Sequence, residues 1–129
     1  MPEPIVFVSR SRVKDGQLEG FREFLREGAR ALDAEKPGTV MFLAYLDASG
    51  AEAAIVHAFP DADAMDAHLQ GVDERSGAAD AFIETTGYEI YGTPSPRVLE
   101  AMQGFASAEG VPLAIIPTYV GGYLRPGSG

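Results

Sequence analysis

The chain has 129 residues, of which 46% are hydrophobic and 22% charged, and its mean hydropathy is close to zero. This profile is typical of one soluble globular domain and excludes a disordered or fibrous chain. The length suffices to bury a core and a ligand-sized cavity. Cysteine is absent, which excludes disulfides, thiolate nucleophiles, iron–sulfur clusters and cysteine–zinc sites. We therefore expect a single domain over residues 1–129.

The net charge of −9 is unevenly distributed along the chain. Residues 1–36 hold seven basic and seven acidic side chains, whereas residues 37–129 hold three and twelve. Such an acidic surface repels phosphate backbones, so we expect no nucleic-acid partner. The first apolar run, Ile5–Val8, is too short for a signal peptide or a membrane span. We expect a cytoplasmic protein with no membrane partner.

The chain opens with the pattern of a strand followed by a helix. Residues 5–14 begin with β-forming residues and then alternate, which predicts a strand. From Leu18 to Leu32, apolar residues recur at helical spacing. We expect Asp15 to cap this helix and residues 36–38 to end it.

A hairpin and a second helical region follow. Residues 39–46 form a nearly continuous apolar run, which predicts a strand buried on both faces. The turn at 47–50 joins it to a second strand over 52–59. The helical region starts at Pro60-Asp61 and continues through 62–86.

Glycines and a proline punctuate the last third of the chain. Gly71 and Gly77 are expected to divide the second helical region into two pieces. Residues 88–91 predict a short fourth strand, and Ser95-Pro96 begins a third helix as cap and first-turn proline. The apolar tail over 111–125 is interrupted by prolines and glycines, and we expect it to lie on the domain or on a partner subunit.

The predicted order is βαββαβ, the pattern of an α+β ferredoxin-like sandwich with helices on one face of an antiparallel sheet. We place this core at residues 4–92 and an added C-terminal helix and tail at 93–129. The strands at 39–46 and 52–59 are apolar on both sides, so the other face of the sheet also needs a cover. A second copy of the sheet is the simplest cover.

Three stretches of the chain resemble the antibiotic biosynthesis monooxygenase family of dimeric α/β barrel proteins. They are IVFVSRSRVKDGQLEGFREFLREGARAL, HAFPDADAMDAHLQG and TTGYEIYG, and the resemblance covers about the first 92 residues. The resemblance implies a homodimer whose two sheets face each other, with a small cavity in each protomer between sheet and helices. Some members oxidise aromatic polyketides or quinols with molecular oxygen and no metal or flavin, and others degrade haem. The catalytic members commonly use tryptophan and asparagine, and this chain contains neither residue type.

His57 and His68 are the candidate catalytic residues, because only histidine has an unperturbed pKa near neutrality. Either imidazole could serve as the general base that deprotonates a phenol or enol before it reacts with oxygen. The alternative interpretation is structural. In that case His68 lies on a helix surface and His57 pairs across the sheet.

Tyrosines and arginines in the predicted strands are candidate substrate-binding residues. Tyr45, Tyr88 and Tyr91 could orient or stack on a phenolic or carbonyl substrate. Arg10 and Arg12 share a strand face and could present guanidinium groups to an anionic substrate. The alternative is that the tyrosines pack and that the arginines are solvated or lie at an interface.

The sequence favours no metal and no other cofactor. Asp61, Asp63 and Asp66 are spaced like the start of a calcium loop, but the required glycine and glutamate are missing at the sixth and twelfth positions. No zinc-binding spacing, nucleotide-binding glycine loop or nucleophile elbow occurs. Asp61 and its neighbours instead favour the positive end of the second helix.

Two functional hypotheses follow for a homodimer that takes a small aromatic or apolar molecule. The first is an enzyme, a cofactor-independent monooxygenase. The alternative is a non-catalytic ligand-binding or protein-interaction module of the same fold. The substrate, and the faces to which the strand residues point, are left open by the sequence.

Overall fold

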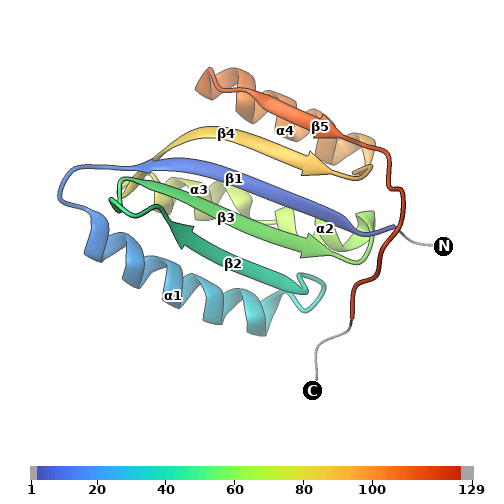
Figure 1. Cartoon of the computed structure of the whole chain (residues 1–129), viewed down its shortest axis with the longest axis horizontal. Coiled ribbons are helices and arrows are strands. Elements are labelled where there is room, and N and C mark those ends of the chain that lie inside the picture. Colours follow the sequence, from blue (N-terminus) through green and yellow to red (C-terminus); the bar gives the residue numbers. More distant parts are fainter. Residues whose placement is uncertain (1–2, 126–129) are drawn as a thin grey trace.

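The computed structural model describes residues 3–125, and the last four residues of the predicted tail lie outside them. A five-stranded sheet forms one layer and four helices form the other (Figure 1). The elements in chain order are β1 (Ile5–Val13), α1 (Leu18–Glu35), β2 (Met41–Leu46), β3 (Glu52–Phe59), α2 (Ala62–Leu69), α3 (Val72–Ala79), β4 (Ile83–Tyr91), α4 (Pro96–Glu109) and β5 (Leu113–Ile116).

The strand order is β2-β3-β1-β4-β5. The first four strands are antiparallel neighbours, and β5 adds to β4 in parallel. The βαββαβ ferredoxin-like arrangement predicted from the sequence is thereby confirmed, with α4 and β5 as the addition at the C-terminus.

The sheet has a helix-facing side and an open side, and residue parity assigns each strand position to one of them. On β1, Ile5 and Phe7 are buried under the helices, whereas Arg10 and Arg12 are exposed on the open side. The register pairs Phe7 with His57 of β3, so His57 also faces the helices. A register shift between Arg10 and Ser11 marks a bulge against β4.

Two apolar clusters fill the space between sheet and helices. One lies under α2 and α4, around Phe59, Met65 and Met102, which are at most 1% exposed. The other lies under α1, around Phe21, which is fully buried. These clusters hold both ends of the helical layer on the sheet and leave the space between them to the site described below.

Two of the three helix N-termini expected from the sequence have the side-chain cap that the sequence indicates. Asp61 accepts a hydrogen bond from the Ala64 amide at 2.8 Å, and Ser95 accepts one from Val98 at 3.2 Å, as expected of N-caps. The expectation for Asp15 is wrong, because α1 has Gln17 at its N-cap position and no side-chain cap there.

The second helical region is shorter than expected. It divides at Gly71, whose φ of 80° requires glycine, but Gly77 lies inside α3. Residues 83–86, predicted as helix, belong to β4. The apolar spacing around Phe82 fits a helix, but the β-branched residues Ile83, Thr85 and Thr86 favour a strand. Ile83 and Thr85 pair with β1, and Thr86 lies at the bulge.

The open side of the sheet and the tail remain partly apolar and exposed. Strand β2, predicted to be buried on both faces, is an edge strand in this chain, with Leu43 43% and Tyr45 59% exposed. Beyond β5 the chain runs along the edge of the domain near the N-terminus (Figure 1). The expectation that the tail lies on the domain is confirmed for Leu113–Ile116, which pair with β4 as β5, whereas Val120 is 96% exposed and Tyr123 80% exposed.

Candidate active site in the cavity between sheet and helices

A cavity of about 430 Å³ lies between the helix-facing side of the sheet and the helical layer. Its floor comes from β1, β2, β3 and β4, and its walls come from α1, α2, α3 and α4. Most of the lining is apolar, with a few polar side chains, and the volume suits a small organic molecule. Both histidines line it.

His57 projects from β3 among aromatic rings and is buried. The Phe7 ring stacks on it at 5.0 Å between centroids, and Phe42 meets it edge-on at 5.1 Å. Its Nδ1 lies 3.1 Å from the Phe7 carbonyl oxygen, to which a neutral ring donates an N–H. Burial lowers the pKa of His57 to about 4. The imidazole is therefore neutral at pH 7, and Nε2 is its proton-accepting nitrogen.

His68 projects from α2 toward His57, and the two ring centroids are 5.0 Å apart. It is 4% exposed, so the interpretation that places it on a helix surface is wrong. Its Nδ1 lies 2.7 Å from the Thr39 hydroxyl oxygen. Burial, and after it the electrostatic effects of the neighbouring His57, Arg75 and Lys36, lower the pKa of His68 to about 3. Two neutral histidines thus stand together in one cavity.

Arg75 brings a cationic group to the same cavity. It lies on α3 and donates hydrogen bonds to the main-chain oxygens of Gln70, at 3.0 Å, and His68. Burial lowers the pKa of Arg75 from its ordinary value, but a guanidinium retains its charge at neutral pH. Sequence reasoning missed this residue. Its signal was that residues 37–129 contain only three basic side chains.

Tyr88 is the one predicted substrate-binding tyrosine that lines this cavity. Its hydroxyl donates a hydrogen bond to Glu109 of α4 at 2.8 Å. Burial raises the pKa of Tyr88, and the hydrogen bond to Glu109 adds to the effect. The phenol therefore stays protonated and joins β4 to α4 at the cavity wall.

The other four predicted substrate-binding residues lie on the open side of the sheet and do not line this cavity. Tyr45 pairs with Ala54 of β3 and Tyr91 pairs with Val6 of β1, positions that point away from the face occupied by His57 and Phe7. Arg10 forms an ion pair with Glu89 at 2.9 Å, and Arg12 forms one with Glu84. These pairs are solvent-exposed ion pairs between neighbouring strands.

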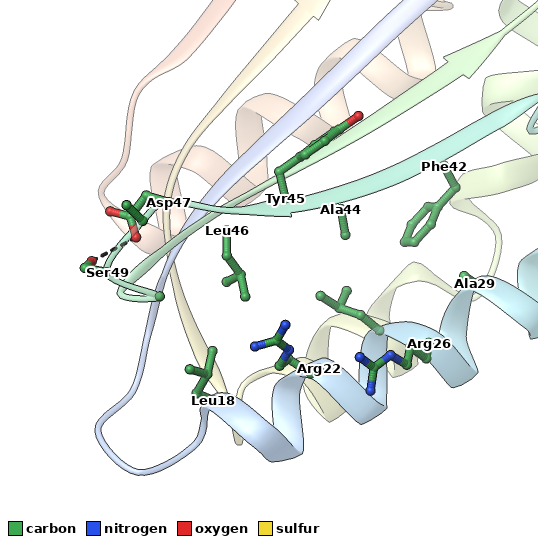
Figure 2. Close-up of a pocket in the computed structure, with 13 residues that line it drawn as sticks. Leu18, Arg22, Arg26, Ala29, Phe42, Ala44, Tyr45, Leu46, Asp47 and Ser49 are labelled. Carbon is green, nitrogen blue, oxygen red and sulfur yellow. Dashed lines mark hydrogen bonds between the residues drawn. The ribbon is translucent and has the colours of Figure 1, made fainter.

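A second hollow, the α1–β2 groove, lies at the edge of the sheet and has a volume of about 660 Å³. Figure 2 shows Arg22 and Arg26 pointing from α1 toward β2, while Tyr45 points to the other side of the strand. Both arginine side chains are about half exposed and lie near Glu19 and Glu23 of their own helix. Neither histidine lines this groove, so we place the candidate active site in the other cavity.

The described residues contain no cluster of three or more histidine, cysteine or acidic side chains able to hold a metal ion. None of the helices within residues 3–125 is long and apolar enough to cross a membrane.

Three solved structures are similar to this one over two thirds or more of the chain. MupZ from Pseudomonas fluorescens superposes with a TM-score of 0.72 at 16% identity, over 96% of each chain. SnoaB from Streptomyces nogalater, a cofactor-independent oxygenase, gives a TM-score of 0.59 at 21% identity, over 72% of this chain and 95% of its own. A candidate antibiotic biosynthesis monooxygenase from Deinococcus radiodurans gives 0.55 at 21% identity, over 67% and 86%.

At the level of sequence, no family model and no curated protein matches the chain. The structural likeness therefore shows a shared fold. The match to MupZ extends over most of the C-terminal helix and tail, because it covers nearly the whole chain. The resemblance noted in the sequence is confirmed at this level: the chain has the ferredoxin-like fold of the antibiotic biosynthesis monooxygenases.

Proposed function

We propose that the protein is a cofactor-independent oxygenase that oxidises a small, mostly apolar or aromatic molecule in the cavity, with His57 or His68 as the general base. The observation that carries this proposal is the pair of buried, neutral histidines in an apolar cavity. The likeness to SnoaB, a cofactor-independent oxygenase, supports it.

The proposed chemistry begins with a proton transfer. The histidine takes a proton from a phenol or enol and leaves an electron-rich anion. An imidazole with a pKa of about 4 is a weak base in the free protein. An oxyanion formed beside it raises its affinity for the proton, and the Arg75 guanidinium stabilises the same anion.

Oxygen then reacts with the activated carbon. Dioxygen adds to the carbanion and takes up the proton, which gives a hydroperoxide. Loss of water leaves a carbonyl, so a CH₂ group and O₂ become C=O and H₂O. The substrate supplies all the electrons, and the protein holds the anion, moves the proton and excludes bulk water.

Oxygen uptake tests the proposal directly. We would use an electron-rich anthrone such as 1,8-dihydroxyanthrone, subtract its uncatalysed oxidation, and add EDTA to remove free metal ions. Saturable, protein-dependent oxygen uptake that persists with EDTA is expected. Saturable binding without oxygen uptake, for anthrones and for any molecule that native mass spectrometry finds in the purified protein, would contradict it and leave a binding module.

We also propose that the protein is a homodimer that buries the open side of the sheet. Leu43 is 43%, Tyr91 38% and Ile116 44% exposed there, and an apolar sheet face of this kind needs a cover. The exposed tail, with Val120 almost fully accessible, would then have a partner surface as well. A second copy is the partner that is always present.

Replacing Leu43 with aspartate should weaken this dimer at least about 100-fold. A twofold axis places the new charge in the interface twice, and an unpaired buried charge is strongly destabilising. Sedimentation equilibrium would measure the dissociation constant, with Ala101→Asp on the exposed face of α4 as the control. A monomeric wild-type protein at micromolar concentration would contradict the proposal.

A further inference from the structure

Ser11 is a buried hydroxyl without a hydrogen-bond partner. It lies on β1, is 2% exposed, and its Oγ makes no hydrogen bond to any residue that the structure describes. Buried side-chain hydroxyls are normally paired, because an unpaired one has lost its hydrogen bonds to water. Ser11 also lines the cavity that contains the two histidines. The Oγ itself is enclosed, so a rotation of this short side chain would bring its unused hydrogen-bonding capacity to the cavity that the residue lines.

The position of Ser11 relative to the histidines follows from the register of the sheet. His57 pairs with Phe7, and Ser11 comes four residues after Phe7 on the same face of β1. At roughly 3.3 Å per residue, the two positions are about 13 Å apart along the sheet. Ser11 pairs with Thr85 of β4, and Ser9 precedes it on the same face of β1; both also line the cavity, together with apolar residues such as Phe24 and Ile83. The cavity thus has a basic end at the histidines and a hydroxyl-bearing end around Ser11, where the Ser11 Oγ is the one without a partner among the described residues.

We propose that Ser11 is the second polar anchor of the cavity and binds the far end of an elongated ligand. The near end of the ligand lies at His57 and His68, and the apolar middle contacts the aromatic lining. The ligand class is a rigid, mostly apolar molecule with a hydroxyl or carbonyl at each end. With one hydrogen bond at each end, the two oxygens are about 7 to 13 Å apart.

This inference rests on one part of the proposed function, that the cavity binds a ligand. It does not rest on the oxidation. The stability of the protein without this hydroxyl distinguishes a ligand anchor from a structural hydroxyl. Because Ser11 bonds to nothing in the described protein, removing its hydroxyl should leave the free protein as stable or more stable. A serine that holds a structural water would behave in the opposite way.

Two phenols of the same shape test the anchor by titration calorimetry. The first is 4,4'-dihydroxybiphenyl, a rigid rod with a hydroxyl at each end, and the second is 4-hydroxybiphenyl, which lacks one of them. The symmetric diol has a statistical advantage of two, and a hydrogen bond to Ser11 should raise its preference to about five- to twentyfold. Ser11→Ala should reduce this preference to about twofold. Ser107→Ala, on the exposed face of α4, should retain it.

Each other result of the titration contradicts the inference in a recognisable way. If the wild-type protein prefers the diol only twofold, or Ser11→Ala keeps the full preference, Ser11 is not an anchor although the cavity binds ligands. A lower melting temperature of Ser11→Ala with an unchanged preference assigns a structural role. If neither phenol binds, the cavity proposal fails together with the anchor.

Discussion

Replacing His57 with glutamine is expected to reduce substrate-dependent oxygen uptake by at least about 100-fold, because a positioned general base contributes typically 10²- to 10⁴-fold to a rate. Glutamine fills a similar volume and can donate a hydrogen bond to the Phe7 carbonyl, as Nδ1 of His57 does. It cannot accept a proton at neutral pH. The substitution therefore removes the base while the buried carbonyl keeps a donor.

His68→Gln is the matched variant, since the two rings are 5.0 Å apart in the same cavity. The base itself is the residue whose loss lowers kcat with little change in KM. The other histidine acts through position, and its loss should affect KM more than kcat. Circular dichroism and the mass in solution would show that both variants remain folded. Unaltered turnover in both single variants would contradict the assignment of either histidine as the base.

The two candidate catalytic residues could be predicted from the sequence because histidine is rare in the chain. His57 and His68 are its only two histidines, so any argument about proton transfer near neutral pH selects them. Their common cavity required the fold. The predicted βαββαβ order puts the helices on one face of the sheet, but the contact between the two rings depends on side-chain direction.

The side of the sheet to which each strand residue points was the main limit of sequence reasoning. Alternation shows that Arg10 and Arg12 share one face of β1 and that Ser11 lies on the other. Because the start of the strand is apolar on both faces, alternation does not show which face the helices cover. For the same reason the sequence named Tyr45 as a candidate without showing that it lies on the open side of β2.

Acidification below pH 6.5 is expected to destabilise the protein steeply, because both histidines are neutral when folded. Burial lowers the pKa of His57 to about 4 and that of His68 to about 3, from an ordinary value of 6.5. As pH falls through 6.5, the unfolded chain binds two protons that the folded chain does not. The free energy of unfolding therefore decreases with falling pH, by up to about 1.4 kcal/mol per pH unit for each histidine.

Urea denaturation at fixed protein concentration, followed by circular dichroism, would measure this effect. Between pH 7.5 and pH 5 we expect a loss of about 4 kcal/mol from the two histidines together, a large fraction of the stability of a typical domain. His57→Gln and His68→Gln should each remove about half of the pH dependence, and the double variant should remove most of it. A wild-type stability that is flat over this range would show that the histidines are not held neutral.

Measuring stability against pH also separates two causes of a loss of activity in acid, namely protonation of the base and unfolding of the protein. Because the folded histidines bind protons only near pH 4 and below, the free protein keeps its base unprotonated throughout the range in which ordinary histidines become charged. Oxygen uptake by the folded enzyme should therefore show no inflection in kcat/KM near pH 6.5. If activity does fall there, the loss should follow the unfolded fraction measured under the same conditions. An inflection near pH 6.5 in fully folded protein would mean that the base is a solvated group outside this cavity.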